Sequence, residues 1–516
     1  MSLEKFIAEI PAAYAVSGKS ILLGGAVYDK KTVPGTAIKL PLSTMNRHGL
    51  IAGATGTGKT KSIQRIAEAL SEQGVNVLLM DIKGDISGIS KSGTLNPKIK
   101  ERMDAIGAPW EPHQYPTELL TISAEKGLRL RATVSEFGPV LFSKVLELND
   151  NQQGGVAIVF KYCDDKKLPL LDIRDFRAAL QHISGGEGKK EIEKNYGSIS
   201  TATSGVIMRK LLELEQQGGD QFFGEKSFEV DDLLQKDSSG KATINILRLA
   251  DIQDRPKLFS TFMLCLLAEI YAKFPETGDK GDPRLIIFID EAHLIFNEAS
   301  KALLQQIETI VKLIRSKGVG IYFCTQAPTD IPESILSQLG TKIQHALRAF
   351  TAKDRKDIKL ISENFPETPY YQTDQLLTEL GIGEALVTVL NEKGVPTPLV
   401  HTMMCAPQSR MDILTVAEQE EIVSGSALAR LYNEEIDRES AYEILNGKIA
   451  AATEVNKEQQ EEATSDTASE ITETIKSIAN NSLTKTVFRE VTRGLMGVLL
   501  GTKTRSSSRR SNKSFF

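Results

Sequence analysis

The segment His48 to Thr60, HGLIAGATGTGKT, decides the fold of this chain. It opens with a short, mainly apolar run, and Gly53 to Thr60 then match the pattern G-x-x-x-x-G-K-[ST]. Glycines let backbone N–H groups approach phosphate oxygens, and a helix that begins directly after the loop adds the favourable dipole of its N-terminus. Lys61 to Glu72 supply such a helical pattern. Strand, glycine-rich loop and helix together predict a P-loop.

This loop predicts a binding site for the triphosphate of ATP. Lys59 is expected to pair with the β- and γ-phosphates, and the hydroxyl of Thr60 is expected to bind Mg²⁺. The residues expected to hold the nucleotide are Gly53, Ala54, Thr55, Gly56, Thr57, Gly58, Lys59 and Thr60. ATP and Mg²⁺ are therefore the expected cofactors.

A second motif, IIFIDEAH from Ile286 to His293, places two acids at the end of an apolar run. Asp290 is expected to hold Mg²⁺, and Glu291 to polarise the water that attacks the γ-phosphate. An acid at a strand end can instead cap a helix, but the P-loop upstream favours the catalytic interpretation. The letters DEAH also occur in two-domain helicases. Because this chain has one P-loop, we interpret His293 as a packing residue or as a residue that contacts a catalytic side chain from behind.

Two further polar residues follow apolar runs. Gln326 ends the run after that of Asp290, where a polar side chain can contact the γ-phosphate or the attacking water. The alternative is that Gln326 simply caps a strand. Asp81 ends the run in MDIKGD and is a further candidate near the phosphates, on position alone.

The apolar runs predict the fold class. They are separated by helical patterns, and near-continuous apolar strands are typical of a parallel sheet that is covered on both faces. We therefore predict an α/β fold: a RecA-like P-loop NTPase core with a mainly parallel sheet. The runs are His48 to Ala52, Val75 to Asp81, Ala242 to Leu249, Arg284 to Asp290 and Gly320 to Gln326.

The predicted organisation adds two features to this core: an inserted helical subdomain and a helical, flexible C-terminal end. The acidic, aromatic-free stretch VNKEQQEEATSDTAS predicts a linker, and the segment after it is basic. The expected parts are a short segment 1–47 with at most a reduced β region, an ATPase core 48–400 with a helical insertion at about 90–280, a helical extension 401–454, an acidic linker 455–483 and a basic tail 484–516.

Composition narrows the class of protein. The 516 residues are 41% hydrophobic and 25% charged, close to the values for folded globular proteins. The four cysteines show no C-x-x-C spacing, and the N-terminus lacks a basic region followed by an apolar stretch, so we expect a cytoplasmic protein. No apolar run approaches the roughly 20 residues that span a bilayer, so we expect no membrane insertion.

Charge is distributed unevenly. The net charge is −5, yet the tail 484–516 carries eight basic residues and one acid, so the rest of the chain is strongly acidic. The tail could bind phosphates or an anionic surface, or it could be a solvated terminus.

Several segments together resemble a bacterial branch of the HerA-like helicase family, within the HerA/FtsK group of motor ATPases. The similarity extends over about residues 21–408, and VTRGLMGVLLG near the C-terminus looks like a signature of the same branch. The segments are NRHGLIAGATGTGKT (Asn46 to Thr60), DIKGDISGI (Asp81 to Ile89), FIDEAHLIF (Phe288 to Phe296), IRSKGVGIYFCTQAPTDIP (Ile314 to Pro332) and LGTKIQHALRAFTAKD (Leu339 to Asp354).

The resemblance implies a homo-oligomeric ring, a hexamer, with ATP bound between subunits. It also implies an arginine that reaches the γ-phosphate of the neighbouring subunit. Arg315 matches that position best and Arg348 is the second choice, while either could be an ordinary surface arginine. Archaeal members act with a nuclease partner on DNA ends and carry an N-terminal β-barrel, whereas only about 47 residues precede the P-loop strand here.

Two functions remain open at this point. The first is an ATP-driven translocase or helicase on double-stranded DNA, held mainly through its phosphates. The second is an ATPase that acts on or regulates a protein complex without moving DNA. Net charge does not decide between them, because a basic pore can lie inside an acidic exterior.

Overall fold

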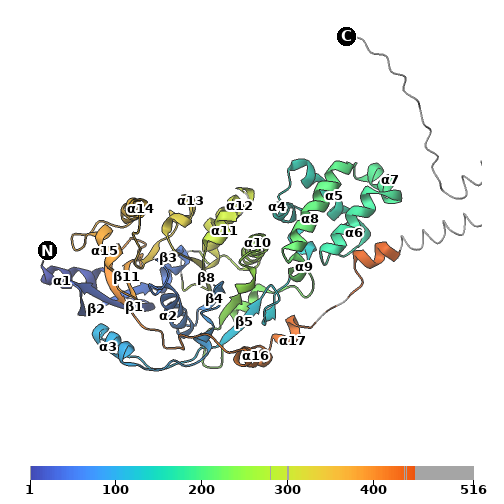
Figure 1. Cartoon of the computed structure of the whole chain (residues 1–516). Helices are drawn as coiled ribbons and strands as arrows, with labels where there is room; N and C mark the ends of the chain where they lie inside the picture. The colour runs from blue at the N-terminus through green and yellow to red at the C-terminus, as the bar shows by residue number, and fades with distance from the viewer. Residues whose placement is uncertain (1, 279–280, 299–300, 435, 437, 448–516) are drawn as a thin grey trace, which may run out of the picture. The chain divides into compact units, whose positions relative to one another are not determined.

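A twelve-stranded sheet runs through the chain in the order β2-β1-β12-β11-β10-β3-β9-β8-β4-β7-β5-β6 (Figure 1). The computed structural model describes residues 2–278, 281–298, 301–434, 436 and 438–447. Residues 1–445 form one unit, which is the part described below, and residues 446–516 form a second. The expected linker 455–483 and basic tail 484–516 lie outside the described residues.

The half of the sheet from β10 to β6 is entirely parallel, as the apolar runs predict. All five predicted strands are present in it. Its strands are β3 (Gly49–Ala52), β4 (Asn76–Asp81), β5 (Thr117–Thr121), β6 (Leu128–Arg129), β7 (Ile244–Arg248), β8 (Leu285–Ile289), β9 (Val319–Thr325) and β10 (Thr341–Gln344).

The other half is antiparallel, and the sequence analysis anticipated only a reduced β region within residues 1–47 of it. It consists of β11 (Glu384–Thr388), β12 (Val400–Met404), β1 (Ser20–Tyr28) and β2 (Lys31–Pro41). The hairpin of β1 and β2 pairs with β12, so the sheet continues across the expected limit at residue 47. The helix α1 (Leu3–Ala13) precedes this hairpin and packs against β2, with its residues Phe6 and Ile10 buried.

Alternation along the strands builds two cores, one on each face of the sheet. In β4, Leu78 belongs to one buried cluster and its neighbour Leu79 to the other. The helix α2 (Lys59–Glu72) covers the face of Leu79, whereas α10 (Pro256–Lys273) and α12 (Lys301–Ile314) cover the face of Leu78. This two-sided burial explains why the central strands are apolar throughout.

Six helices form the inserted region, α4 to α9, and they gather at one end of the sheet in Figure 1. Aromatic rings such as Phe142 and Phe176 pack at its centre. Within the expected insertion at 90–280, β5, β6 and β7 are strands of the main sheet, while α3 (Pro97–Ile106) packs on β1 and β2. The helices are α4 (Val134–Val145), α5 (Asp150–Lys166), α6 (Ile173–Ser184), α7 (Gly186–Asn195), α8 (Thr201–Gln216) and α9 (Gly219–Phe222).

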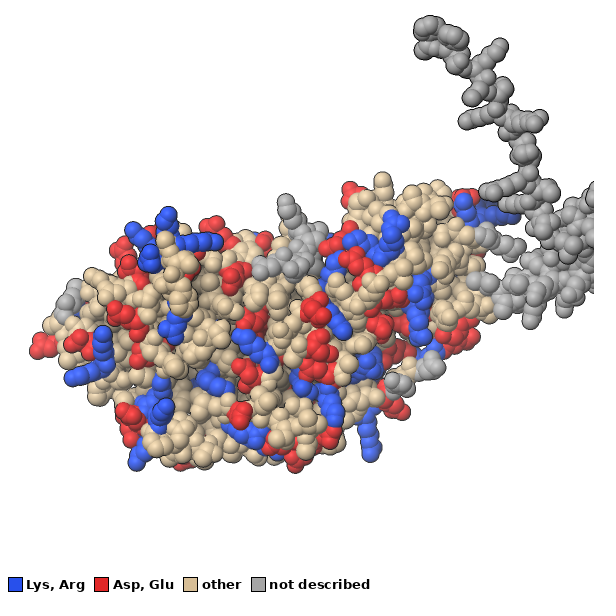
Figure 2. Space-filling view, viewed as in Figure 1, with Lys and Arg blue, Asp and Glu red and all other residues tan. Residues whose placement is uncertain are grey.

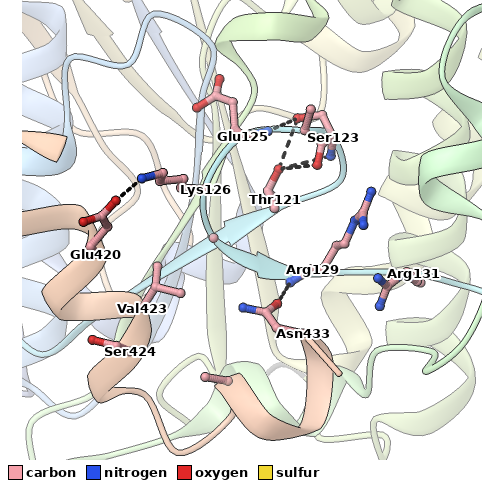
Figure 3. Close-up of a pocket in the computed structure, with 13 residues that line it drawn as sticks. Thr121, Ser123, Glu125, Lys126, Arg129, Arg131, Glu420, Val423, Ser424 and Asn433 are labelled. Atoms are coloured by element: carbon pink, nitrogen blue, oxygen red, sulfur yellow. Dashed lines mark hydrogen bonds and ion pairs between the residues drawn. The ribbon is translucent and has the colours of Figure 1, made fainter. Parts of the chain in front are cut away.

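After β12 the chain runs as an extended strap, residues 408–445, that contains α16 (Val416–Gly425) and α17 (Ala429–Tyr432). Figure 3 shows α16 and α17 across a cavity of about 760 Å³ from β5 and β6, with Lys126 facing Glu420. The strap ends with Ala441 and Leu445 fully buried in the same core as the inserted helices. The strap therefore connects the end of β12, in the antiparallel half of the sheet, to the inserted helices.

The remaining helices are α11 (His293–Glu298), α13 (Glu333–Leu336), α14 (Ala352–Ser362) and α15 (Thr373–Glu379). In the part of the chain that the structure describes, no helix combines the length and apolar character that a membrane span requires.

Candidate active site

The P-loop lies at the carboxyl edge of the parallel strands, the edge where open α/β sheets bind ligands. Two neighbouring strands hold it. Gly53 N–H donates to the carbonyl of Thr325, the last residue of β9, at 3.2 Å, and Ala54 N–H donates to the carbonyl of Ala346, which follows β10, at 2.8 Å. The ammonium of Lys59 lies over the loop and donates to Gly53 O at 2.5 Å and Ala54 O at 3.2 Å. Lys59 is 6% exposed. The backbone and the lysine thus form the predicted anion cradle.

Two glycines of this loop are required by space as well as by conformation. Gly53 has φ +151°, and a Cβ there would lie 2.5 Å from Cβ of His345. Gly58 has φ +111°, and a Cβ there would lie 3.0 Å from the backbone nitrogen of Gly383. A larger residue at either position would displace the segments that support the loop.

The two predicted acids lie at the same edge, after β8. Asp290 and Glu291 are 3% and 5% exposed. Burial lowers the pKa of Lys59, and the charges of Glu291 and Asp290 oppose that effect, which places both carboxylates within electrostatic reach of the ammonium. Burial also raises the pKa of Asp290 to about 6. The structure thus brings together the P-loop and the acid pair, which are more than 200 residues apart in the sequence.

Glu291 is held in an unusual conformation. Its φ of +46° lies in the left-handed region, which non-glycine residues rarely adopt and which tends to occur at functional sites. Its Oε1 forms an ion pair with Nζ of Lys83, and its Oε2 lies 3.2 Å from Nδ1 of His293 without forming a hydrogen bond. Burial lowers the pKa of Lys83, but the hydrogen bond that its ammonium donates to Glu291 and the charge of Asp290 outweigh burial, so the pKa is raised.

Two acids lie at the end of β4: Asp81, which the sequence analysis named as a candidate, and Asp85 in the following loop, which it did not. Asp81 accepts hydrogen bonds from the N–H groups of Gly84, Asp85 and Ile86, so its oxygens hold the loop together. Burial raises its pKa to about 7. Asp85 instead lies 3.4 Å from the hydroxyl of Thr60. Both acids belong to MDIKGD, so position in the sequence could not tell which one faces the P-loop.

Buried carboxylate oxygens without partners mark this edge. Oδ2 of Asp290 and Oδ1 of Asp85 have no hydrogen-bond partner. A buried, unpaired carboxylate oxygen is costly, so these oxygens fit a bound cation or its water shell. With Thr60 beside them, the residues present fit the expected Mg²⁺.

Gln326 follows β9 and is exposed at the same edge. The preceding Thr325 bonds the P-loop through its carbonyl, and its hydroxyl donates to Asp330 at 2.5 Å. β9, which Gln326 follows, lies between β3, the strand before the P-loop, and β8, the strand before Asp290. The expected sensor role requires this position.

The two candidate arginines lie at opposite edges of the sheet. Arg315 directly precedes β9 and acts electrostatically on His48, which precedes β3, so it lies at the amino edge. Arg348 follows β10, two residues after Ala346, and is exposed at the carboxyl edge near its own P-loop. Only Arg315 is placed where it cannot reach the phosphates of its own subunit.

His345 supports the P-loop from behind and was also not singled out from the sequence. Its ring bonds the hydroxyl of Ser62 at 3.0 Å and the carbonyl of Glu384 at 2.9 Å. It is fully buried, and burial lowers its pKa to about 4, so the ring is neutral at pH 7. The segment QHALRAF contained it, but a buried histidine has no sequence signature of its own.

The fold and the site define an ATP-hydrolysing P-loop NTPase with a RecA-like core. The family model for the HerA-like helicase C-terminal region matches residues 28–507, so this chain belongs to the HerA-like helicase family.

Two named relatives agree with this assignment. The DNA double-strand break repair helicase HerA of Saccharolobus solfataricus is 24% identical over 376 residues, which cover 68% of this chain and 63% of the relative. The DNA import protein CedB of Sulfolobus acidocaldarius is 23% identical over 392 residues, 75% of this chain and 56% of the relative. The chain thus spans less than two thirds of the length of either relative.

Two structures of conjugative coupling proteins share the fold. The bacterial coupling protein TrwBdeltaN70 in complex with sulphate has a TM-score of 0.52 at 14% identity, and the match covers 79% of this chain and 94% of that one. The plasmid coupling protein TrwB in complex with ADP and Mg²⁺ has a TM-score of 0.50 at 14% identity, covering 78% and 98%.

Proposed function

We propose that this chain is a subunit of a ring-shaped motor that hydrolyses ATP with Mg²⁺ and moves along double-stranded DNA. The observation that carries the proposal is the convergence of Lys59, Asp290 and Glu291 at one edge of the sheet, with an unpartnered carboxylate oxygen on Asp290. Membership of the HerA-like helicase family supports the DNA substrate.

Thr60, Asp290 and Asp85 would hold Mg²⁺, which neutralises charge on the β- and γ-phosphates when it is bound. Among the residues that the structure describes, no group of three His, Cys, Asp or Glu side chains could hold a metal by itself. Mg²⁺ sites in ATPases commonly use one or two carboxylates together with substrate phosphates and water, so such a group is not needed.

The chain's own residues divide the work of hydrolysis. Lys59 and the N–H groups of the P-loop bind and orient the phosphates. Glu291 orients and polarises the attacking water, and Gln326 contacts that water or the γ-phosphate. Lys83 positions Glu291 through their ion pair.

The position of Arg315 supports a ring of identical subunits. It lines a cavity of about 470 Å³ at the amino edge, together with Arg47 and Lys342. Because the phosphate site lies at the opposite edge, an arginine of this cavity can serve only the site of a neighbouring subunit. We propose that Arg315 does so in a hexamer, with Arg348 as the second candidate.

The charge on the surface is compatible with both functions considered from the sequence. On the face in Figure 2, basic and acidic side chains are interspersed, so DNA would be held elsewhere, by basic loops inside the ring. The second candidate function is an ATPase that acts on a protein complex. A nuclease partner and a cytoplasmic location stay predictions.

DNA-stimulated ATP hydrolysis is the deciding experiment. The motor should hydrolyse ATP faster with double-stranded DNA, and the stimulation should weaken as salt rises, because phosphate contacts release counterions. DNA with blocked ends separates movement along DNA from binding at ends. ATP hydrolysis that no nucleic acid stimulates at low salt would favour the protein-directed ATPase.

A further inference from the structure

The strap leaves a cavity of about 760 Å³ where it crosses the end of the parallel sheet (Figure 3). Residues 121–131 form one wall of this strap cavity, and α16, α17 and Asn433 form the other. β5 and β6 end at the cavity, at the carboxyl edge of the sheet where α/β proteins bind ligands. Five strand spacings, roughly 24 Å, separate β5 from β3, so the cavity is remote from the P-loop.

The size and lining of the strap cavity suit a small organic molecule. Its volume falls within the range of about 300–1,000 Å³ that is typical of small-molecule sites. Small or apolar side chains make up much of the lining, among them Ala124, Val423 and Ala429. A few polar and charged groups lie between them. Such a lining holds the apolar body of a ligand and orients it through one charged or polar group.

The two acids that line the strap cavity are already paired. Glu125 forms an ion pair with Arg248 at 2.7 Å, and Glu420 on α16 forms one with Lys126 (Figure 3). Within the described residues, Arg129 forms no ion pair with any acid. The cavity is therefore lined by a guanidinium whose charge no acid among those residues neutralises.

Arg129 belongs to the alternating run LRLR, residues 128–131, at the edge of the sheet. Because successive residues of a strand face opposite sides, Leu128 and Leu130 enter the core while Arg129 lines the cavity. Figure 3 shows the side chain of Arg129 extending away from Asn433, which accepts only its backbone N–H, at 3.0 Å. Nε of Arg129 is buried without an acceptor. An oxyanion that accepts from this guanidinium would remove that cost.

The strap ties this cavity to two other parts of the molecule. At its start, the N–H and the hydroxyl of Ser409 donate to Glu68, which is fully buried on α2, the helix after the P-loop. At its end, the N–H of Tyr442 donates to Asp175 on the inserted helix α6 at 2.8 Å. Between these anchors, α16 and α17 cross the cavity. A ligand that contacts both walls would therefore restrict the strap between its two anchors.

We propose that the strap cavity binds a small organic oxyanion, a carboxylate or a phosphate on an apolar body, and that the bound ligand holds the strap against the sheet. Arg129 binds the oxyanion through its guanidinium, and Val423 and Ala429 contact the apolar body. This site is separate from the P-loop and independent of the nucleotide that the P-loop binds.

Four probes test the site while saturating Mg-ADP occupies the P-loop. Phenyl phosphate and benzoate combine an oxyanion with a ring, inorganic phosphate lacks the ring, and benzyl alcohol lacks the charge. Calorimetry measures affinity, and hydrogen exchange followed by mass spectrometry measures the protection of residues 416–433. Phenyl phosphate or benzoate should bind with a Kd of about 1–5 mM and slow exchange in these residues. The tighter of the two identifies the head group, and the other two probes should bind about 10-fold more weakly or less.

Substitutions at Arg129 locate the oxyanion. Arg129→Gln should weaken binding of the tighter probe by about 10- to 100-fold, because hydrogen bonds from a charged group are lost. Arg129→Lys should lie between this variant and the wild type, since lysine keeps the charge but not the planar fork. Arg174→Gln is the matched control: Arg174 pairs with Asp172 and lines only the neighbouring cavity of about 400 Å³, which Arg129 also borders. All three variants should keep the wild-type affinity for Mg-ATP, which checks that they are folded.

Several outcomes would overturn this site. These are the absence of binding by both phenyl phosphate and benzoate, binding that leaves exchange in residues 416–433 unchanged, and equal probe affinity in Arg129→Gln and the wild type. An equal loss in Arg174→Gln would place the ligand in the neighbouring cavity instead. If Arg129→Gln fails to bind Mg-ATP, Arg129→Lys decides, because unchanged probe affinity there also contradicts the contact with Arg129.

Discussion

The two edges of the parallel sheet differ in the charged side chains that they carry. The carboxyl edge combines the P-loop lysine with buried acids, of which Asp290 and Asp85 have unpartnered oxygens. The amino edge instead gathers Arg47, Arg315 and Lys342 around a cavity. The length of the strands separates Arg315 from the P-loop of its own subunit, whereas Arg348 lies at the carboxyl edge beside that loop. The difference therefore favours an enzyme completed by contact between subunits.

The largest expected effect comes from the carboxyl edge alone. Lys59→Ala should weaken ATP binding by about 100-fold or more and abolish turnover, because it removes the buried cation that neutralises the phosphates. Calorimetry with Mg-ATP measures the affinity. Lys161→Ala on α5 is a control that should leave ATP binding unchanged, because Nζ of Lys161 pairs with Asp165 among the inserted helices and does not contact the P-loop. Normal ATP binding by Lys59→Ala would contradict the assignment.

A change at the amino edge should lower the rate of ATP hydrolysis without weakening ATP binding. Arg315→Ala should lower kcat by about 10³-fold, the smaller end of the range for an arginine supplied in trans. Mixing Arg315→Ala with Lys59→Ala subunits should restore part of the hydrolysis, because some interfaces then pair an intact P-loop with an intact arginine. The same mixture made with Arg348→Ala tests the second candidate. A mixture without any rescue would leave Arg315 with no role across an interface.

The acid pair should separate binding from chemistry. Glu291→Gln keeps the shape of the side chain but cannot accept a proton, so kcat should fall by about 10²- to 10³-fold while ATP still binds. Single-turnover hydrolysis and nucleotide binding, measured on the same sample, check both. A loss of ATP binding would instead mean that Glu291 and its ion pair with Lys83 hold the site together.

Each edge also contains a fully buried histidine, and the smallest effect compares them. His48 bonds Ile321 N–H and Val311 O at the amino edge, and His345 bonds Ser62 and Glu384 at the carboxyl edge. Burial lowers the pKa of each to about 4, below the ordinary value of 6.5. The unfolded chain therefore binds protons first as the pH falls, and stability is lost between about pH 6.5 and pH 4.

At pH 5 this loss amounts to roughly 2 kcal/mol for each histidine. Urea unfolding at pH 7 and pH 5 measures it, with His48→Gln and His345→Gln as the two comparisons. Each variant should show a smaller difference between the two pH values than the wild type. ATP binds the folded state, so it should offset part of the loss of stability at pH 5 in each variant that keeps an intact P-loop.

The central strands and the catalytic motifs could be predicted because each has a local pattern. The strand before the P-loop and the strand that ends in Asp290 are buried on both faces, so their apolar runs stand out. The antiparallel strands did not stand out. β11 and β12 are only five residues long each, and β2 alternates buried and exposed residues around Pro34 and Gly35, which resembles a turn-rich segment.

The spacing of the glycines, the lysine and the threonine was enough to predict a triphosphate site, because that spacing encodes the backbone geometry that phosphates need. The acid pair Asp290 and Glu291 was predicted from a local pattern in the same way. That Asp85 and not Asp81 faces Thr60, and that Arg315 and Arg348 lie at opposite edges of the sheet, could be learned from the folded chain alone. The same is true of the strap cavity that residues 121–131, α16 and α17 enclose. These relations depend on strand order and on contacts between segments hundreds of residues apart, which no local pattern contains.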